Sequence, residues 1–394
     1  MQLTTPRQLV TQFAHVLQQK LFPNLEITVG ELDPQLQLLS SVMALLPLGR
    51  MLSARQSGTG RPARDRAALA TAFIAKAILN LPTTRDLMSR LRVDDALRRV
   101  CGWSSPKAVP HESKFSRAFA DFAASQLPQQ LHAAVIATTQ SQRLVGHIAR
   151  DSTAIPVRER YPEPPPKPKS KSKSKSKAGN NKKKRAKGPM PKAKATERGT
   201  RIQQQRRQKL SEMLSNLPQN CDMGAKTNSK GHQQYWRGYK LHLDVADGQV
   251  PISAILTSAS VHDSQAAIPL MTQTSERVTY LYELMDSAYD ANEIHQHSKQ
   301  LAHVPIITPH KRRATRKPSQ LPKVFPAVAV PELTWAQQSR MKERTMIERV
   351  NARLKDEFGA SQIRVRGAAK VMAHLMFGVL ALTVDQWIRF ATRI

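Results

Sequence analysis

The spacing of hydrophobic residues changes once along the chain, at about residue 144. Before this point, apolar residues recur every three or four positions, as they do on the buried face of an amphipathic helix. Residues 67–79 are a clear example, and no alternating strand pattern occurs in this part of the sequence. The spacing therefore predicts that residues 1–140 form an all-helical region.

After residue 144 the sequence has short apolar or alternating runs that are typical of β-strands. They lie at residues 144–151, 239–245, 250–256, 278–286 and 304–308. Asp247 and Gly248 join the second run to the third, which predicts a hairpin. Helical spacing returns at residues 263–272, 290–301 and 338–358. The order of three strands, helix, strand, helix, strand and helix predicts a mixed α/β domain.

Several features of the sequence predict a cytoplasmic protein that is not inserted in a membrane. The apolar run at residues 371–384 contains His374 and is shorter than the roughly 20 residues that span a bilayer, so it predicts a buried helix. Residues 1–10 are polar and lack the apolar run of a secretory signal. Two cysteines far apart in the sequence, Cys101 and Cys221, exclude a disulfide framework and a zinc ribbon.

The charge of the chain changes the range of possible partners. The 394 residues include 61 lysines and arginines but only 29 aspartates and glutamates, a net charge of +32. This excess excludes a basic partner and favours nucleic acid. A hydrophobic content of 40% is enough for a real core, which argues against a wholly disordered chain.

Half of the net charge lies in residues 162–209, which contain 18 lysines and arginines and two acids. The segment opens with prolines and then alternates lysine with serine, so it has little apolar surface and is expected to be disordered on its own. One interpretation is a flexible arm that binds DNA phosphates without sequence preference. The other is a solvated insertion that only aids solubility. Because the rest of the chain is also basic, the sequence favours the arm.

Three acids are candidates for a catalytic site. Asp151 and Asp286 each end a predicted strand, and their carboxylates would converge at one sheet edge if those strands are parallel neighbours. Glu348 lies in the predicted helix 338–358, next to Arg344 and Lys355 on the same face, because a helix turns about 100° per residue. An apolar stripe beside them would dock this helix on the sheet: it consists of Ile347, Val350, Leu354 and Phe358.

Three facing carboxylates repel one another unless cations lie between them, and oxygen ligands suit Mg²⁺ or Mn²⁺. Two such ions, ~3.5–4 Å apart, can activate a water or a 3′-hydroxyl for displacement at a phosphodiester. Arg344 and Lys355 could then hold backbone phosphates. Each feature has a plainer interpretation: an aspartate after a strand is often a cap, and such a helix face is often a solvated surface. No phosphate-binding loop of the GxxxxGK type and no GxSxG elbow is present, which argues against NTP hydrolysis and serine-hydrolase chemistry.

Arg344, Glu348 and Lys355, separated by three and six residues, resemble the Tyr-Arg-Glu-Lys signature of DDE transposases from bacterial insertion sequences. The tyrosine of that signature falls on Met341. Three stretches of the catalytic part are similar to the second strand, the third strand and the second-aspartate motif of this family: residues 238–243, 260–264 and 286–290. Residues 60–117 are similar to its helical N-terminal domain.

The resemblance implies a domain organisation. Residues 1–140 would form a helical domain for DNA binding or assembly, and residues 141–394 an RNase H-like catalytic domain. The catalytic domain would hold a mixed five-stranded sheet flanked by helices, interrupted by the disordered basic insertion 162–209.

The resemblance also implies a reaction: binding of terminal inverted repeats, Mg²⁺-dependent cleavage, and joining of 3′ ends to target DNA. Asp151, Asp286 and Glu348 would bind two Mg²⁺ ions, for which Mn²⁺ could substitute, and catalyse; Arg344 and Lys355 would contact DNA. The partner would be double-stranded DNA, bound by a homodimer or larger assembly in the nucleoid of the cytoplasm.

Two other functions stay open. One is a DNA-binding descendant of a transposase whose chemistry has lapsed, and the other is a general basic nucleoid protein. A protein that binds by charge alone has no need of three acids in their strand and helix context, which disfavours the second. Trp335 also has two interpretations, packing or stacking on an extruded base, of which packing is favoured.

Overall fold

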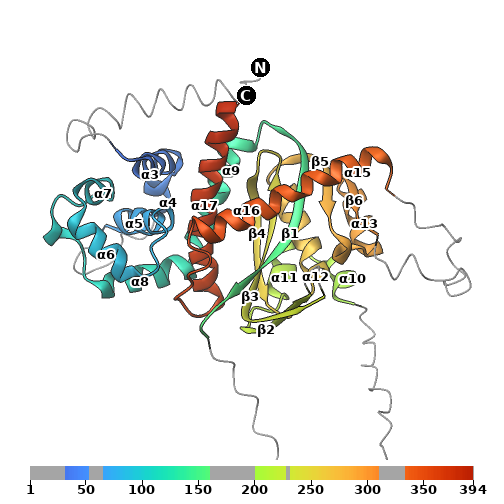
Figure 1. Ribbon diagram of the computed structural model, residues 1–394, viewed down its shortest axis with the longest axis horizontal. Coiled ribbons are helices and arrows are strands. Elements are labelled where there is room, and N and C mark those ends of the chain that lie inside the picture. The colour runs from blue at the N-terminus through green and yellow to red at the C-terminus, as the bar shows by residue number, and fades with distance from the viewer. Residues whose placement is uncertain (1–31, 53–64, 160–199, 228–230, 310–332, 394) are drawn as a thin grey trace, which may run out of the picture.

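The computed structural model describes residues 32–52, 65–159, 200–227, 231–309 and 333–393. Helices from the N-terminal part lie on one side of the long helix α17, Ala368–Arg393, and a mixed sheet lies on its other side (Figure 1). Because α17 packs on both, the two parts share one buried apolar core. The predicted domain boundary at residue 140 therefore stays a prediction.

The described N-terminal residues are helical, as predicted. The helices are α3 Pro34–Leu45, α4 Leu48–Leu52, α5 Arg66–Ile78, α6 Thr84–Val93, α7 Asp95–Val100, α8 Glu112–Ala124 and α9 Leu127–Gln140. Helix α5 is buried from Ala68 to Ile78 because alanine, leucine, isoleucine and phenylalanine occupy nearly every position. It packs against α3, α8 and α17 and forms the centre of this part.

Six described strands form one sheet: β1 Leu144–Pro156, β2 Asp222–Thr227, β3 Gln233–Ala246, β4 Val250–Ser258, β5 Thr279–Met285 and β6 Val304–Ile307. Strand β3 pairs antiparallel with β1, β2 and β4, whereas β1, β5 and β6 run parallel. The predicted hairpin is β3 and β4. The predicted fold class, a mixed sheet flanked by helices after a helical N-terminal part, is confirmed.

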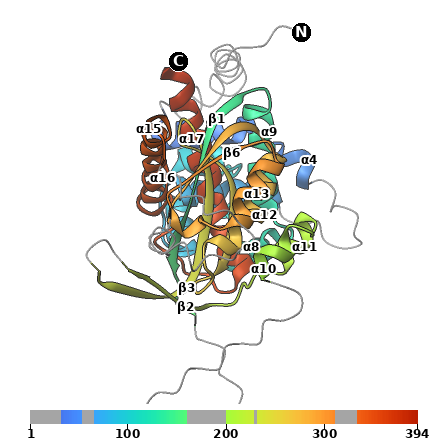
Figure 2. The ribbon, with the colours of Figure 1, turned by 90° about the vertical axis from the view of Figure 1, so that its right-hand side faces the viewer.

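Strand β2 is an addition to the five predicted strands. It pairs with residues 233–238 of β3, whereas β4 pairs with residues 239–246. The β2–β3 ribbon projects away from the body of the sheet (Figure 2). Because the ribbon is largely exposed, its sequence lacks the apolar alternation of a half-buried strand.

Helices cover both faces of the sheet (Figure 2). One face carries α10 Arg201–Gln205, α11 Leu210–Ser215, α12 Ser264–Ser275 and α13 Asn292–Gln300. The other carries α15 Trp335–Met341, α16 Thr345–Asp356 and α17. The one helix predicted over residues 338–358 is thus interrupted: a 3₁₀ turn, η5 Lys342–Arg344, separates α15 from α16.

The predicted disorder of residues 162–209 is corrected at its end. Residues 160–199 lie outside the described part, but residues 201–205 form α10. There the Gln205 side chain donates a hydrogen bond to the carbonyl of Gln265, 2.8 Å away, and Ile202 packs on an apolar cluster under α12. These contacts give the end of the basic segment a fixed place on the sheet domain.

The buried helix predicted at residues 371–384 is α17. By length and composition, residues Ala368–Ala391 could cross a membrane, but 78% of the most apolar window is buried inside the protein. Burial of this kind is typical of a core helix. The packing role favoured for Trp335 is wrong, because its side chain is 83% exposed at the start of α15.

Candidate active site

Asp286 directly follows strand β5, as predicted, but the prediction that Asp151 ends a strand is wrong, because Asp151 lies inside β1, which continues to Pro156. Ala149 of β1 pairs with Leu284 of β5, and this is the last residue pair between the two strands. Asp151 lies two residues after Ala149, and Asp286 lies two residues after Leu284. The structure therefore brings the two predicted acids together at one edge of the sheet, within electrostatic reach of each other.

Burial dominates the chemistry of Asp151. Its carboxylate is only 14% exposed, and burial raises its pKa to about 6. A hydrogen bond from the Ser152 N–H, 2.8 Å long, and the positive charges of Lys226 and Arg344 lower the pKa in part, whereas Asp286 raises it. The nearby cations therefore offset only part of the rise in pKa that burial causes.

Asp286 also caps the short 3₁₀ helix that follows β5, η3 Ser287–Tyr289. Its Oδ1 accepts a hydrogen bond of 2.9 Å from the N–H of Ala288. This contact fixes the direction of the carboxylate. Asp286 can therefore cap the 3₁₀ helix and still serve as a catalytic acid.

Helix α16 docks on β1 and β3 as its sequence predicts. The whole apolar stripe is buried: Ile347, Val350, Leu354 and Phe358. Glu348 lies beside the stripe and is 58% exposed. The packing of α16 therefore puts Glu348 on the side of the sheet that carries Asp151.

Arg344 lies between Glu348 and Asp151. Its Nη2 donates a hydrogen bond of 3.0 Å to Glu348 Oε1, and its Nη1 lies 3.7 Å from Asp151 Oδ2. Within the described residues, no three acid, histidine or cysteine side chains group closely enough to hold a metal ion. The predicted gathering of three carboxylates is thus only partly present, because the guanidinium of Arg344 stands where Glu348 would meet the aspartates.

Lys355 is partly buried on the same face of α16, and burial lowers its pKa. Lys226, on the β2–β3 ribbon, adds to this effect and also acts on Asp151. The ribbon thus brings to the site a cation that the sequence analysis missed. No pattern in the sequence of β2 could have revealed it, because the contact depends on strand pairing.

Two further polar side chains near the aspartates were also missed, although both lie in stretches that carry the family resemblance. Tyr289 is fully buried, its hydroxyl has no hydrogen-bond partner among the described residues, and its pKa is raised by burial and by Asp263, Asp151 and Asp286. Asp263 accepts a hydrogen bond of 2.8 Å from Lys240 Nζ. Burial opposes ionisation of Asp263, but nearby positive charge lowers its pKa overall.

A buried ion pair fixes the strand that carries Asp151. Arg150, 1% exposed, donates from Nε and Nη2 to the two carboxylate oxygens of Asp244 on β3, at 2.8 and 2.6 Å. Glu283 on β5 lies 3.5 Å from the same guanidinium, and the Thr274 hydroxyl donates to Asp244 at 2.6 Å. These contacts hold β1 against both neighbouring strands one residue before Asp151.

The donors at the sheet edge fit a hard divalent cation. Asp151 and Asp286 supply carboxylate oxygens, the ligands that Mg²⁺ and Mn²⁺ prefer. The raised pKa of Asp151 and the unbonded hydroxyl of Tyr289 mark a buried polar space that has not been fully satisfied by protein groups. Glu348 would have to leave Arg344 to complete the set.

Two family models match the chain. Residues 146–384 match the transposase DDE domain, which is more than half of the sequence, and residues 28–121 match a transposase domain. No curated protein and no solved structure matches. The two aspartates and the Glu348 helix fall within the first match. The chain belongs to the family of transposases that carry a DDE domain.

Proposed function

We propose that this protein binds the terminal inverted repeats of its insertion sequence and catalyses Mg²⁺-dependent DNA cleavage and strand transfer by a two-metal mechanism. The observation that carries the proposal is that Asp151 and Asp286 lie two residues after Ala149 and Leu284, the last residue pair of the parallel strands β1 and β5, and within electrostatic reach of each other. Two acids that share a sheet edge, one of them buried and close to cations, suit a metal-dependent phosphoryl-transfer site.

Asp151, Asp286 and Glu348 are the residues that would hold the metal ions. Bound there, two ions would activate the attacking hydroxyl and stabilise the leaving oxygen. Asp151 must be ionised for this role, and because its pKa is about 6 it is ionised at neutral pH. Arg150 keeps β1 in register, and the N–H of Ala288 orients Asp286.

Arg344 and Lys355 are proposed as contacts to the DNA backbone. Arg344 is paired with Asp151 and Glu348, so it can bind a phosphate only after it leaves these acids. We infer that loading of the site exchanges partners: Glu348 turns to the aspartates, and Arg344 turns to DNA. Lys226 would join them as a third backbone contact.

The proposed partner is double-stranded DNA, at both the transposon ends and the target. Because two ends must be held together, the active form would be a homodimer or a larger assembly. The helices before residue 140 would serve DNA binding or assembly. The proposed location is the cytoplasm, on the nucleoid.

Cleavage of a labelled DNA fragment that carries the flanks of this gene tests the proposal, with Mg²⁺ or with EDTA. Wild type should cut at specific sites with Mg²⁺ and should not cut with EDTA. Asp286→Ala should bind DNA but not cut, because it removes a carboxylate at the sheet edge. Glu343→Ala is the matched control: it removes an exposed acid next to Arg344 and should cut as wild type does.

The alternative is a DNA-binding descendant with lapsed chemistry. It is favoured by one observation, that Glu348 is held by Arg344 and stands apart from the aspartates. This alternative predicts that wild type binds a fragment with confirmed terminal repeats and makes no metal-dependent cut.

A further inference from the structure

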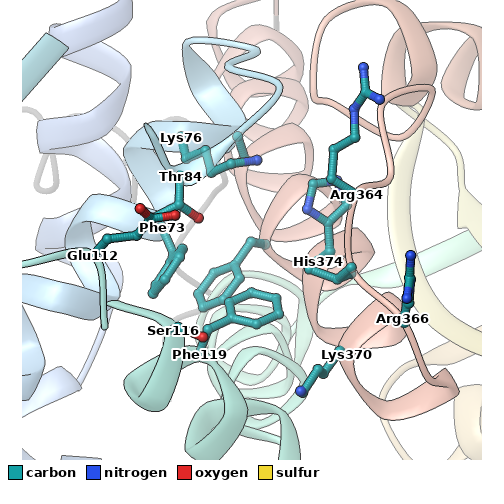
Figure 3. A pocket seen from close by; sticks show the side chains of 13 residues that line it. Phe73, Lys76, Thr84, Glu112, Ser116, Phe119, Arg364, Arg366, Lys370 and His374 are labelled. Carbon is teal, nitrogen blue, oxygen red and sulfur yellow. The ribbon is translucent and has the colours of Figure 1, made fainter. Parts of the chain in front are cut away.

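A cavity of about 440 Å³ lies where the N-terminal helices meet the chain that follows α16 (Figure 3). Its walls come from α5, the start of α6, α8, residues 364–366 and the first turns of α17. None of the proposed catalytic acids lines it. The cavity is therefore separate from the site at the sheet edge.

Four cations and one acid line this pocket. Lys76 of α5 reaches into it from one side, and Arg364, Arg366 and Lys370 stand on the other side (Figure 3). Within the described residues, no ion pair joins any of the four to an acid. The single acid, Glu112, is held by Arg85, whose Nε lies 3.1 Å from both carboxylate oxygens. The pocket therefore has positive charge that the described part of the chain does not offset with ion pairs.

Lys76 is the most unusual of the four. It is 8% exposed, and burial lowers its pKa to about 8, although Asp86 acts in the opposite direction. His374, opposite it, adds no charge at neutral pH because burial and Lys76 lower its pKa to about 4. Burial removes part of the hydration of this ammonium, so an oxyanion that enters the pocket would gain a strong, charge-assisted hydrogen bond from it.

The floor of the pocket is aromatic. Phe73, Phe119 and Phe377 pack together, with the ring centroid of Phe73 4.9 Å from that of Phe119 and 5.9 Å from that of Phe377. Apolar rings under the cations lower the local dielectric constant, which strengthens attraction to an anion.

The position of the pocket relative to α16 indicates where its anion comes from. Helix α16 begins next to Asp151 and leads toward the N-terminal helices (Figure 1). Its 12 residues span about 18 Å, the rise of about five base pairs. Arg364 and Arg366 follow it in the sequence and are exposed. A duplex that runs from the acids along α16 would thus carry its backbone to the pocket.

We propose that this pocket binds a backbone phosphate of the DNA substrate, about five or more base pairs from the bond that is cut, through Lys76, Arg364, Arg366 and Lys370. It rests on the proposed function, because the distance is counted from the cleaved bond. The pocket would fix the duplex at a second point, so that DNA is held on both sides of α16.

The test measures affinity of the full-length protein for a labelled 30-base-pair duplex at several salt concentrations. Arg364→Gln/Arg366→Gln should lose about tenfold in affinity and lower the salt slope by about two. Lys76→Met, which keeps an apolar stem, should lose several-fold. Lys114→Gln/Arg117→Gln is the charge-matched control: both residues are exposed on α8 and do not line the pocket, so the loss should be at most about threefold.

Methylphosphonates, which remove the charge of one phosphate, locate the contact. Neutral groups placed five to eight base pairs from the cut should weaken binding by wild type but not by Arg364→Gln/Arg366→Gln. Equal losses in the pocket variant and the α8 control would overturn the proposal. So would a pocket that binds thymidine monophosphate or inorganic phosphate in calorimetry while the pocket variants keep full affinity for duplex.

The affinity and the salt slope are measured without cleavage, so these two outcomes are independent of the reaction. If wild type never cuts DNA but the pocket variants still lose affinity and salt slope, the phosphate contact stands and the transposase proposal fails. If wild type cuts normally and the pocket variants bind like the α8 control, only the pocket proposal is wrong.

Discussion

The guanidinium of Arg344 lies 3.7 Å from the carboxylate of Asp151 and holds Glu348 through a second nitrogen. One side chain therefore links the helix of the third acid to the strand of the first. The positive charge that Arg344 supplies is weaker than that of a divalent cation, so the arrangement suits a site in which ions replace the arginine when DNA is bound.

Arg344→Gln should change the pH dependence of cleavage. Arg344 lowers the pKa of Asp151, so its loss should raise that pKa above about 6. The acid limb of the pH–rate profile should then move to higher pH, and the cleavage rate should fall by about tenfold or more through the lost phosphate contact. Single-turnover cleavage between pH 5 and 9 measures both effects. An acid limb that stays in place would show that Arg344 does not act on Asp151.

Asp151→Asn should stabilise the fold at neutral pH while it abolishes cleavage. Burial raises the pKa of Asp151 to about 6 in the folded state, so the ionised form is disfavoured by folding and its cost is fully present above pH 6. The variant removes this cost, roughly 1–3 kcal/mol. As the pH falls from about 6 to about 4, the carboxylate is protonated and the gain should shrink.

Urea unfolding at pH 8, 6 and 4 in the absence of divalent ions measures this gain. Glu343→Gln, which changes an exposed acid near the same helix, should have little effect at any pH. A variant Asp151→Asn that is no more stable than wild type at pH 8 would contradict the argument from burial.

Arg150→Met should destabilise the protein strongly, by about 3–5 kcal/mol, because Asp244 is left buried and unpaired. The double variant Arg150→Met/Asp244→Leu should recover most of that loss. Arg85→Gln, which breaks an exposed ion pair, should cost less than about 1 kcal/mol. Denaturant unfolding measures all three. If the double variant is as unstable as the single one, the buried pair is not the source of the effect.

Deletion of residues 162–199 should weaken binding to every DNA sequence alike and flatten the salt dependence, because the segment is strongly basic. The deletion stops before α10, which packs on the sheet domain. A glycine-serine segment of equal length is the matched control for chain connectivity and should behave as the deletion does. An unchanged salt slope in titrations between 50 and 200 mM salt would reject the arm.

The parallel strands and their acids could be predicted because the information is local. The apolar run that becomes β5 leads directly into Asp286, as predicted. The run at residues 144–151 gives only the first part of β1, because the strand continues through Asp151 to Pro156. The face of α16 could be predicted for the same reason: its apolar stripe is buried as expected. These patterns predict where the acids lie, but they do not show that the acids bind a metal ion.

The missed features depend on contacts between distant segments. Lys226 reaches the site through a strand pair whose sequence has no strand pattern, and Arg150 finds Asp244 across a sheet. The break between α15 and α16 was missed because residues 342–344 are polar and helix-compatible, and only the structure shows the 3₁₀ turn. The phosphate pocket combines residues from α5 and α17, which are far apart in sequence.

The central claim, that Asp286 is a metal ligand in DNA cleavage, is tested most directly by a change of ligand and metal. Asp286→Cys should not cut DNA with Mg²⁺, which binds sulfur poorly, but should regain cleavage with Mn²⁺. Wild type and the neighbouring control Ser287→Cys should cut with both ions. If Asp286→Cys cuts as well as wild type with Mg²⁺, or if wild type cuts with neither ion, the account of this site is wrong.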